Sequence, residues 1–236
     1  MKGLVFIVFS FLSISSLGQE VEILKKSTSA KSINDTRFEF LRENINPKSL
    51  VFVGTLRATG KDKKASLSKL YFKLKDQAYV MGANSFKMAN YTKNEIRKEA
   101  SLTVDVFKAN DSVLNNSKAT RERNVIYVFL NDFTENESYI FTISGSDKEI
   151  ESGTYYRYQL KQGESATIDS GGLLSSSFTL KWKKDNPSSF ITLTDFGQED
   201  PSKDYEYSGR FFNTKRINFM ESSLGWLLIE LMKPMK

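Results

Sequence analysis

The chain has 236 residues, of which 39% are hydrophobic and 13% aromatic, so it can bury one large core or two modest ones. It contains neither cysteine nor histidine, which excludes disulfides, a thiol nucleophile, a Ser-His-Asp triad and a histidine-ligated metal site. The net charge of +6 includes lysines scattered along the chain, a distribution that favours ordinary solubility; anionic lipid headgroups or cell-wall polymers are the alternative partners, ahead of nucleic acid.

The amino terminus has the pattern of a secretory signal peptide. Lys2 precedes an apolar run at 3–17, and small residues stand just before Gln19, as they do at a cleavage site. A membrane anchor is the alternative, but the run is short for a bilayer span and serines interrupt it. We therefore predict that residues 1–18 are removed, that no later segment spans the membrane, and that the protein is exported to the periplasm or the extracellular space.

The next segments predict a leader and the start of a first domain. Residues 19–48 are polar, and within them "TRFEFLREN" at 36–44 is expected to form one or two helical turns. A small α/β domain, one helix on a short sheet, is then expected over residues 49–120. Its first strand covers 49–60, because the side chains alternate there and the run stops at a glycine.

An apolar stripe then predicts a helix from about Ala65. Its members recur at helical spacing and are Leu67, Leu70, Tyr71, Leu74, Ala78 and Met81. Gly82 stands just past the stripe, where a residue without a Cβ ends a helix in the left-handed conformation. We interpret "GAN" at 82–84 as this helix stop, with contact to a ligand as the alternative. Alternating strands are expected to follow at 83–88 and 102–106.

The pattern A-x-x-x-GAN-x-F, from Ala78 to Phe86, is similar to small secreted envelope domains related to the outer-membrane stress-sensor lipoproteins and the heavy-metal-binding-like family. In those domains a helix ends in a similar GAN turn and leads into a strand. The resemblance implies the same succession here. This chain lacks the cysteines of the sensor lipoproteins, so it implies neither their disulfides nor their lipid anchor.

The second half predicts an all-β domain over residues 121–236. The Asn- and Ser-rich stretch at 110–121 is expected to be a linker loop. Beyond it, short alternating runs separated by turn residues indicate a β-sandwich or barrel. We expect strands at 124–130, 138–144, 153–160, 164–168, 177–183 and 189–194, and closing strands around 217–219 and in "GWLLIELM" at 225–232.

Three stretches of this half resemble a domain of unknown function found in bacterial envelope proteins. They are "RNVIYVFLND" at 123–132, "EIESGTYYRYQLKQGES" at 149–165 and "FTLKWKKDNPSSFITLT" at 178–194. Gln162 stands where that family usually has proline. The resemblance implies an immunoglobulin-like sandwich without known catalysis. The expected fold class is therefore α+β, a small α/β domain followed by an immunoglobulin-like sandwich.

Aromatic and arginine side chains of the second domain are the candidate binding residues. Such residues supply contact area together with a polar group, which suits sugar stacking or protein docking. Packing within a sheet is the alternative role for the tyrosines. The candidates are Tyr155, Arg157, Tyr205, Tyr207 and Arg210.

Acidic residues supply the remaining chemical possibilities. Asp147, Glu149 and Glu151 alternate along one hairpin, which usually marks a solvated face but is also a place for carboxylate acid-base catalysis. A loop at 194–204 contains oxygen ligands without the spacing of an EF-hand, so we expect a solvated loop and no metal or cofactor. Its acids are Asp195, Glu199, Asp200 and Asp204.

These patterns together favour a non-catalytic, two-domain binding or adaptor protein whose partner is a protein or polysaccharide of the bacterial envelope. The alternative is a secreted hydrolase that uses carboxylates to act on cell-wall or extracellular sugars. A hydrolase requires a deep pocket with two acids that face each other, which the sequence alone does not reveal.

Overall fold

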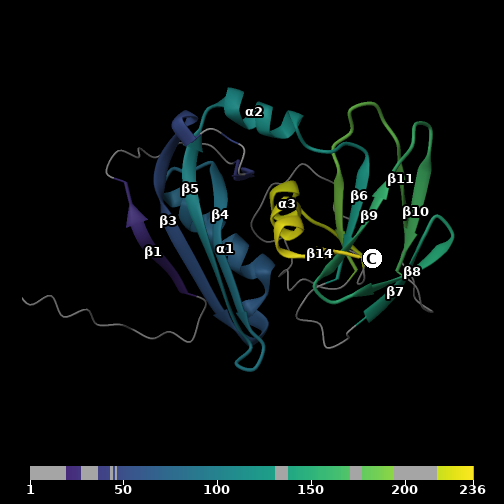
Figure 1. The fold of residues 1–236 in the computed structure, drawn as a ribbon, viewed down its shortest axis with the longest axis horizontal. Helices are drawn as coiled ribbons and strands as arrows, with labels where there is room; N and C mark the ends of the chain where they lie inside the picture. The colour runs from purple at the N-terminus through teal and green to yellow at the C-terminus, as the bar shows by residue number, and fades with distance from the viewer. Residues whose placement is uncertain are drawn as a thin grey trace, which may run out of the picture.

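The computed structural model describes residues 20–27, 37–42, 45, 47–130, 138–170, 177–193 and 217–235. Within this part of the chain, sheets and helices combine into an α+β fold, as the sequence predicts (Figure 1). The strands form one five-stranded sheet from the first half of the chain and two further sheets from the second half.

The first sheet has the strand order β1-β3-β5-β4-β2. Its strands are β1 (Glu20–Lys26), β2 (Glu39–Phe40), β3 (Leu50–Lys61), β4 (Ser85–Asn94) and β5 (Glu99–Ala109). The long strands β3, β5 and β4 are antiparallel neighbours, and β2 adds to β4 in parallel. A turn of 3-10 helix, Pro47–Ser49, precedes β3, and another, Asp62–Ala65, leads from β3 towards the first helix.

The segment 19–48, expected to be a polar leader, supplies both edge strands of this sheet. β1 pairs with β3, and β2 pairs with β4 at the opposite edge. Residues 37–42 contain no helical turn, which corrects the expectation for "TRFEFLREN". The physical reason is burial, because Phe38 and Phe40 are only 4% and 3% exposed and alternate with polar neighbours as an edge strand requires.

Helix α1 (Leu67–Val80) packs its predicted apolar stripe against the sheet and ends as expected at "GAN". Gly82 has a φ of +79°, in the left-handed region. The Gly82 amide donates to the Tyr79 carbonyl at 2.9 Å, and the Ala83 amide donates to the Ala78 carbonyl at 2.9 Å. These two bonds form a Schellman motif, so the prediction of a glycine helix cap is confirmed.

The stretch at 110–121, predicted to be a loop, contains helix α2 (Asp111–Ala119). The Asn110 side chain accepts a hydrogen bond from the Val113 amide at 3.0 Å, which is the N-cap interaction. Leu114 is 1% exposed and anchors the helix from its inner side. The prediction was wrong because a capping asparagine and a single buried leucine are enough to hold a short polar helix.

The second half folds into two sheets. One has the order β11-β10-β7-β8 and the other β13-β12-β6-β9-β14. The strands are β6 (Val125–Phe129), β7 (Ser138–Ile143), β8 (Ser146–Glu151), β9 (Thr154–Gln159), β10 (Ser165–Asp169), β11 (Ser177–Lys181), β12 (Ser189–Thr192), β13 (Asn218–Phe219) and β14 (Lys233–Pro234). All six predicted strands between 124 and 194 are confirmed, and residues of both sheets share a second hydrophobic cluster.

Strand β6 is buried on both faces. Ile126 and Val128 belong to the second cluster between the two sheets, whereas Tyr127 and Phe129 belong to the first cluster on the other side. The sheet that contains β6 is therefore a central layer, with the β11-β10-β7-β8 sheet on one side and helices on the other (Figure 1).

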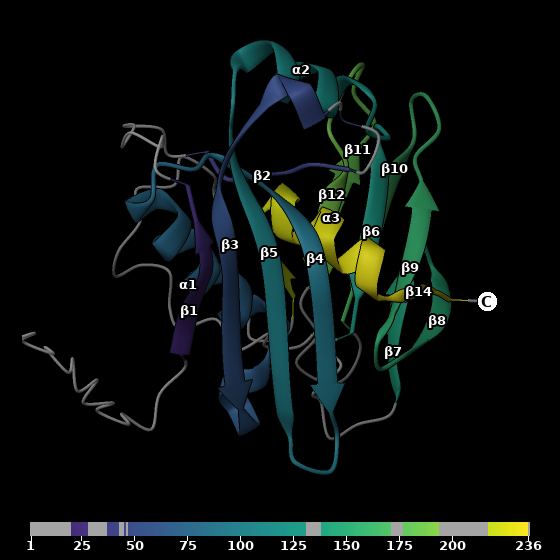
Figure 2. The same cartoon turned by 60° about the vertical axis from the view of Figure 1, so that its left-hand side comes forward.

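Helix α3 (Ser222–Leu231) lies between the first sheet and the sheet that contains β6 (Figure 2). The strand predicted at 225–232 is thus wrong. A short apolar run gives no usable periodicity when nearly every side chain is buried. Gly225 makes the packing possible, since a Cβ at this position would lie 2.1 Å from Cδ1 of Phe190 in β12.

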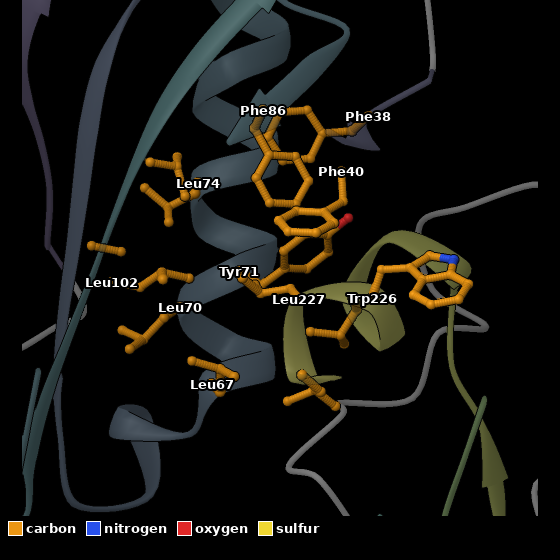
Figure 3. Packing of buried hydrophobic residues seen from close by; sticks show 14 of the residues in the cluster. Phe38, Phe40, Leu67, Leu70, Tyr71, Leu74, Phe86, Leu102, Trp226 and Leu227 are labelled. Atoms are coloured by element: carbon orange, nitrogen blue, oxygen red, sulfur yellow. The ribbon is translucent and has the colours of Figure 1, made fainter. Parts of the chain in front are cut away.

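The first hydrophobic cluster combines residues from both halves of the chain (Figure 3). Phe38 stacks on Phe86 with ring centroids 4.5 Å apart, and Trp226 and Leu227 of α3 close the same cluster. Beyond the apolar contact, Glu221 accepts hydrogen bonds from the Tyr71 hydroxyl and from Lys75 Nζ, the latter at 2.5 Å. The proposed boundary between domains 49–120 and 121–236 stays a prediction, but this core crosses it.

In the described part of the chain, no helix has the length and apolar character needed to cross a membrane.

Candidate functional site

The register of β6 and β9 brings two of the predicted binding residues together. Tyr155 pairs with Phe129 and Arg157 pairs with Tyr127, so both predicted side chains emerge from the face of the central sheet that carries α3. They belong to a group of residues that we call the junction cluster, because it lies where the two halves of the chain meet. Its members are Arg42, Arg121, Glu122, Tyr127, Tyr155, Arg157 and Trp226.

Glu122 and Arg157 form a bidentate ion pair in this cluster. The Arg157 Nε and Nη2 atoms donate to the two carboxylate oxygens at 3.2 and 2.8 Å, and the Tyr127 hydroxyl donates to the same carboxylate. Partial burial opposes ionisation of Glu122, but the hydrogen bonds from Arg157 and Tyr127 outweigh it and hold the pKa of Glu122 below its ordinary value. The guanidinium plane of Arg157 is therefore held in a fixed orientation.

Arg157 nevertheless reaches solvent. Its side chain is 41% exposed and that of Glu122 is 43% exposed, so the ion pair contributes little to stability, on the order of 1 kcal/mol or less. Hydrogen bonding to Glu122 raises the pKa of Arg157, which keeps the group positively charged. The ion pair thus places an oriented positive charge at the surface.

Tyr155 has the packing position that the sequence left open as the alternative to a free binding residue. It packs against the first hydrophobic cluster, with its ring centroid 5.9 Å from those of both Tyr127 and Phe129. Burial, and then the charge of Glu122, raise the pKa of Tyr155 above its ordinary value. Tyr155 is accordingly a half-buried residue at the rim of the core and not a free surface tyrosine.

The Trp226 ring lies close to two arginines that sequence reasoning did not single out. The guanidinium carbon of Arg42 is 4.6 Å from the Trp226 ring centroid, and that of Arg121 is 5.6 Å away. Both are within the range of a cation-π interaction. Arg42 and Trp226 are far apart in sequence and stand in segments expected to be a leader and a closing strand, so no local pattern could have found the pair.

Arg121 is a buried arginine of the cluster, with a side chain only 8% exposed. It donates to the Phe40 carbonyl at 2.6 Å and to Glu39 at 3.5 Å, which connects the end of α2 to β2. Burial lowers the pKa of Arg121; the negative charge of Glu39 opposes this shift, and the nearby positive charge of Arg42 adds to it. The cluster therefore holds two positive charges close to one indole ring.

The other sequence candidates fall elsewhere. Tyr205, Tyr207 and Arg210 lie outside the described residues, and so do the acids of the loop at 194–204. Within the described part of the chain, no three acidic side chains gather closely enough to hold a metal ion.

The acids considered for hydrolysis lie on β8 at the edge of the outer sheet. Glu149 and Glu151 line a surface hollow of about 550 Å³ together with Ser138 and Ser152. Ser138 Oγ donates to Glu149 at 2.7 Å, and Thr142 Oγ1 donates to Asp147 at 2.7 Å. The three acids alternate along a single strand, so they project from one face and do not face each other across a substrate.

Comparisons with known proteins assign no family to the chain. It matches no protein-family profile and no curated protein. Among solved structures, a crystal structure of the Francisella virulence factor FvfA matches with 16% sequence identity and a TM-score of 0.31, over 38% of this chain and 98% of that one. A likeness of this size supports no conclusion about fold or function.

Proposed function

We propose that the protein is a non-catalytic binding or adaptor protein of the bacterial envelope, and that its partner docks at the junction cluster. The observation that carries the proposal is the position of the Arg157 guanidinium group. This group is exposed, Glu122 fixes its orientation, and the aromatic side chains of Tyr155 and Tyr127 lie beside it. Arginine and tyrosine are enriched among the residues that contribute most of the binding energy at protein interfaces.

Export to the periplasm or the extracellular space is part of the same proposal. It rests on the lysine and apolar run at 2–17 and on the small residues before Gln19. Amino-terminal sequencing of the protein recovered from its native host tests it, and the mature chain is expected to begin at or near Gln19. Recovery of the membrane-bound chain with Met1 retained contradicts it.

The finer fold assignment, an immunoglobulin-like sandwich in the second half, is also proposed. Two sheets that share one hydrophobic cluster, and the resemblance of the stretches at 123–194 to an envelope domain of unknown function, support it. The parallel pairs β12-β6 and β14-β9 are a departure from a purely antiparallel Greek-key sandwich.

The experiment is affinity capture from the native envelope with three forms of the mature protein. The wild type, Arg157→Ala and the control Arg97→Ala are compared, because Arg97 is an exposed arginine in the β4–β5 turn, away from the cluster. We expect Arg157→Ala to weaken capture of the specific partner by about tenfold. Tyr155→Ala is a poorer test, because it also removes packing from the core.

Equal capture by Arg157→Ala and the wild type contradicts docking at the junction cluster. The competing function, a carboxylate hydrolase, has one observation in its favour, the hollow lined by Glu149 and Glu151. Loss of cell-wall sugar hydrolysis on Glu149→Gln or Glu151→Gln, with partner capture by Arg157→Ala unchanged, replaces the binding function with hydrolysis.

A further inference from the structure

Three arginines from separate segments of the chain converge at the junction cluster. Arg42 follows β2, Arg121 follows α2 and Arg157 belongs to β9. Arg42 and Arg121 both lie against the Trp226 ring. Arg42 also lies close enough to Glu122, the partner of Arg157, for its charge to help lower the pKa of that carboxyl. Two of the guanidinium groups therefore lie at one indole ring, and Arg42 connects this pair with the carboxylate that binds Arg157.

The carboxylates near these arginines are already engaged. Glu39 binds Lys118 at 2.7 Å as well as Arg121 at 3.5 Å, so its two oxygens are divided between two cations. Glu122 accepts from Arg157 through both oxygens. Three positive side chains, Lys118, Arg121 and Arg157, thus share these two carboxylates, and Arg42 adds a fourth positive charge, which leaves an excess of positive charge.

The excess positive charge belongs to Arg42 and to the part of the Arg157 guanidinium group that does not bind Glu122. Among the residues that the structure describes, no carboxylate pairs with Arg42. Its guanidinium group instead makes a cation-π contact with the Trp226 ring. Arg157 uses Nε and Nη2 for Glu122 and Gln159, and within the same described residues its Nη1 atom has no acceptor. Arg42 is half-buried and Arg157 is exposed, so both residues have surface in contact with solvent.

We propose that the junction cluster binds a phosphate group, an inference that rests on the proposed binding function and names the chemistry of the partner. One guanidinium group can donate a hydrogen bond to each oxygen of a planar carboxylate, as Arg157 does to Glu122. A tetrahedral phosphate accepts hydrogen bonds from several directions and suits arginines that approach from different segments.

Fluorescence of Trp226 provides a direct measurement. The chain has two tryptophans, so a Trp182→Phe background isolates the fluorescence of the indole that Arg42 and Arg121 contact. Inorganic phosphate is titrated at constant ionic strength into this protein and into its Arg42→Gln, Arg157→Gln and Arg97→Gln variants. We expect a saturable signal that Arg42→Gln and Arg157→Gln each weaken about tenfold or more and that the Arg97 control leaves unchanged.

The titration also separates the other outcomes. A response that chloride reproduces at equal ionic strength, or that survives both cluster variants, overturns the proposal, and acetate binding as tightly as phosphate replaces phosphate with a carboxylate ligand. Because Arg42 contacts Trp226 in the core, unfolding of Arg42→Gln would leave Arg157→Gln, a surface change, as the deciding variant.

Two further binding measurements distinguish a lipid phosphate from a polysaccharide phosphate. Vesicles that contain phosphatidylglycerol present a lipid phosphate, and a soluble phosphorylated polysaccharide presents the same group without a membrane. Binding of either one that depends on Arg157 identifies the source, and binding of neither, with no response to free phosphate, overturns the inference. If capture of the envelope partner still depends on Arg157 in that case, the proposed binding function stands and only the phosphate is wrong.

Discussion

The side-chain amide of Asn84 forms two hydrogen bonds with the backbone of Ala109. Asn84 Nδ2 donates to the Ala109 carbonyl at 2.9 Å, and Asn84 Oδ1 accepts from the Ala109 amide at 2.8 Å. Asn84 is 2% exposed, and its own amide donates to the Phe107 carbonyl. The side chain thus continues the β4–β5 ladder beyond the first residue of β4, and the asparagine of "GAN" is a structural residue.

We predict that Asn84→Ala destabilises the protein by about 2–4 kcal/mol, because it leaves a buried donor and a buried acceptor of Ala109 unsatisfied. Asn90→Ala, at an exposed position of the same strand, is the control and is expected to cost about 0.5 kcal/mol or less. Urea unfolding of the two variants measures the difference. Equal midpoints would show that water replaces the Asn84 amide without cost.

We predict that Gly82→Val costs about 1–2 kcal/mol, since a β-branched residue is strained at a φ of +79°. Gly82→Asn is the matched comparison, because asparagine tolerates the left-handed region better than other residues with a Cβ. Thermal unfolding is expected to rank wild type above Gly82→Asn and Gly82→Asn above Gly82→Val. A Gly82→Val protein as stable as the wild type contradicts the role of this glycine as a helix cap.

We predict that Leu227→Ala in α3 destabilises the first half of the chain by about 2–5 kcal/mol, because it opens a cavity in the cluster that α1 and the first sheet share with α3. Hydrogen exchange is expected to speed up in α1 and β5. Ile168→Ala, in the second cluster, is the control and is expected to act first on β7 and β11. Unchanged exchange in α1 after Leu227→Ala would show that the two halves are independent.

We predict that stability falls above pH 10. Burial, and then the charge and hydrogen bond of Glu221, raise the pKa of Tyr71 well above its ordinary value of 10.0, and burial and Glu122 raise that of Tyr127. Folding therefore favours the neutral phenols, so their contribution is complete below pH 10 and is lost as pH rises towards the folded pKa values. Unfolding free energy measured by urea from pH 8 to about 11.5 checks this.

The tyrosine prediction has its own control. The phenylalanine of the Tyr71→Phe variant cannot ionise, so this variant is expected to lose less stability than the wild type over the same alkaline range. Its free energy of unfolding is expected to be lower at pH 8, because Glu221 loses a hydrogen bond. Phenolate absorbance of the wild type is expected to show groups that titrate only as the protein unfolds. Parallel pH profiles for the two proteins contradict the assignment to Tyr71.

The helix and strands predicted from the sequence were those whose signal is local. A helix or strand that buries one face shows a regular repeat of apolar residues over a short stretch of sequence. Such a repeat predicted α1, together with the glycine that ends it, and the strand that contains Leu102, Val104 and Val106. Tyr155 and Arg157 stand two apart on one strand, so their shared face also follows from the sequence, whereas their role in binding stays a prediction.

Only the tertiary structure decided what depends on distant partners. The sequence at 36–44 became an edge strand because β4 was beside it, and "GWLLIELM" became a helix because apolar surfaces surround it on several sides. The junction cluster joins Arg42 to Trp226, and Glu221 joins the carboxyl-terminal helix to Tyr71 across 150 residues. The sequence by itself determined the local periodicities, whereas burial and charge pairing between segments far apart in the chain determined how those elements meet.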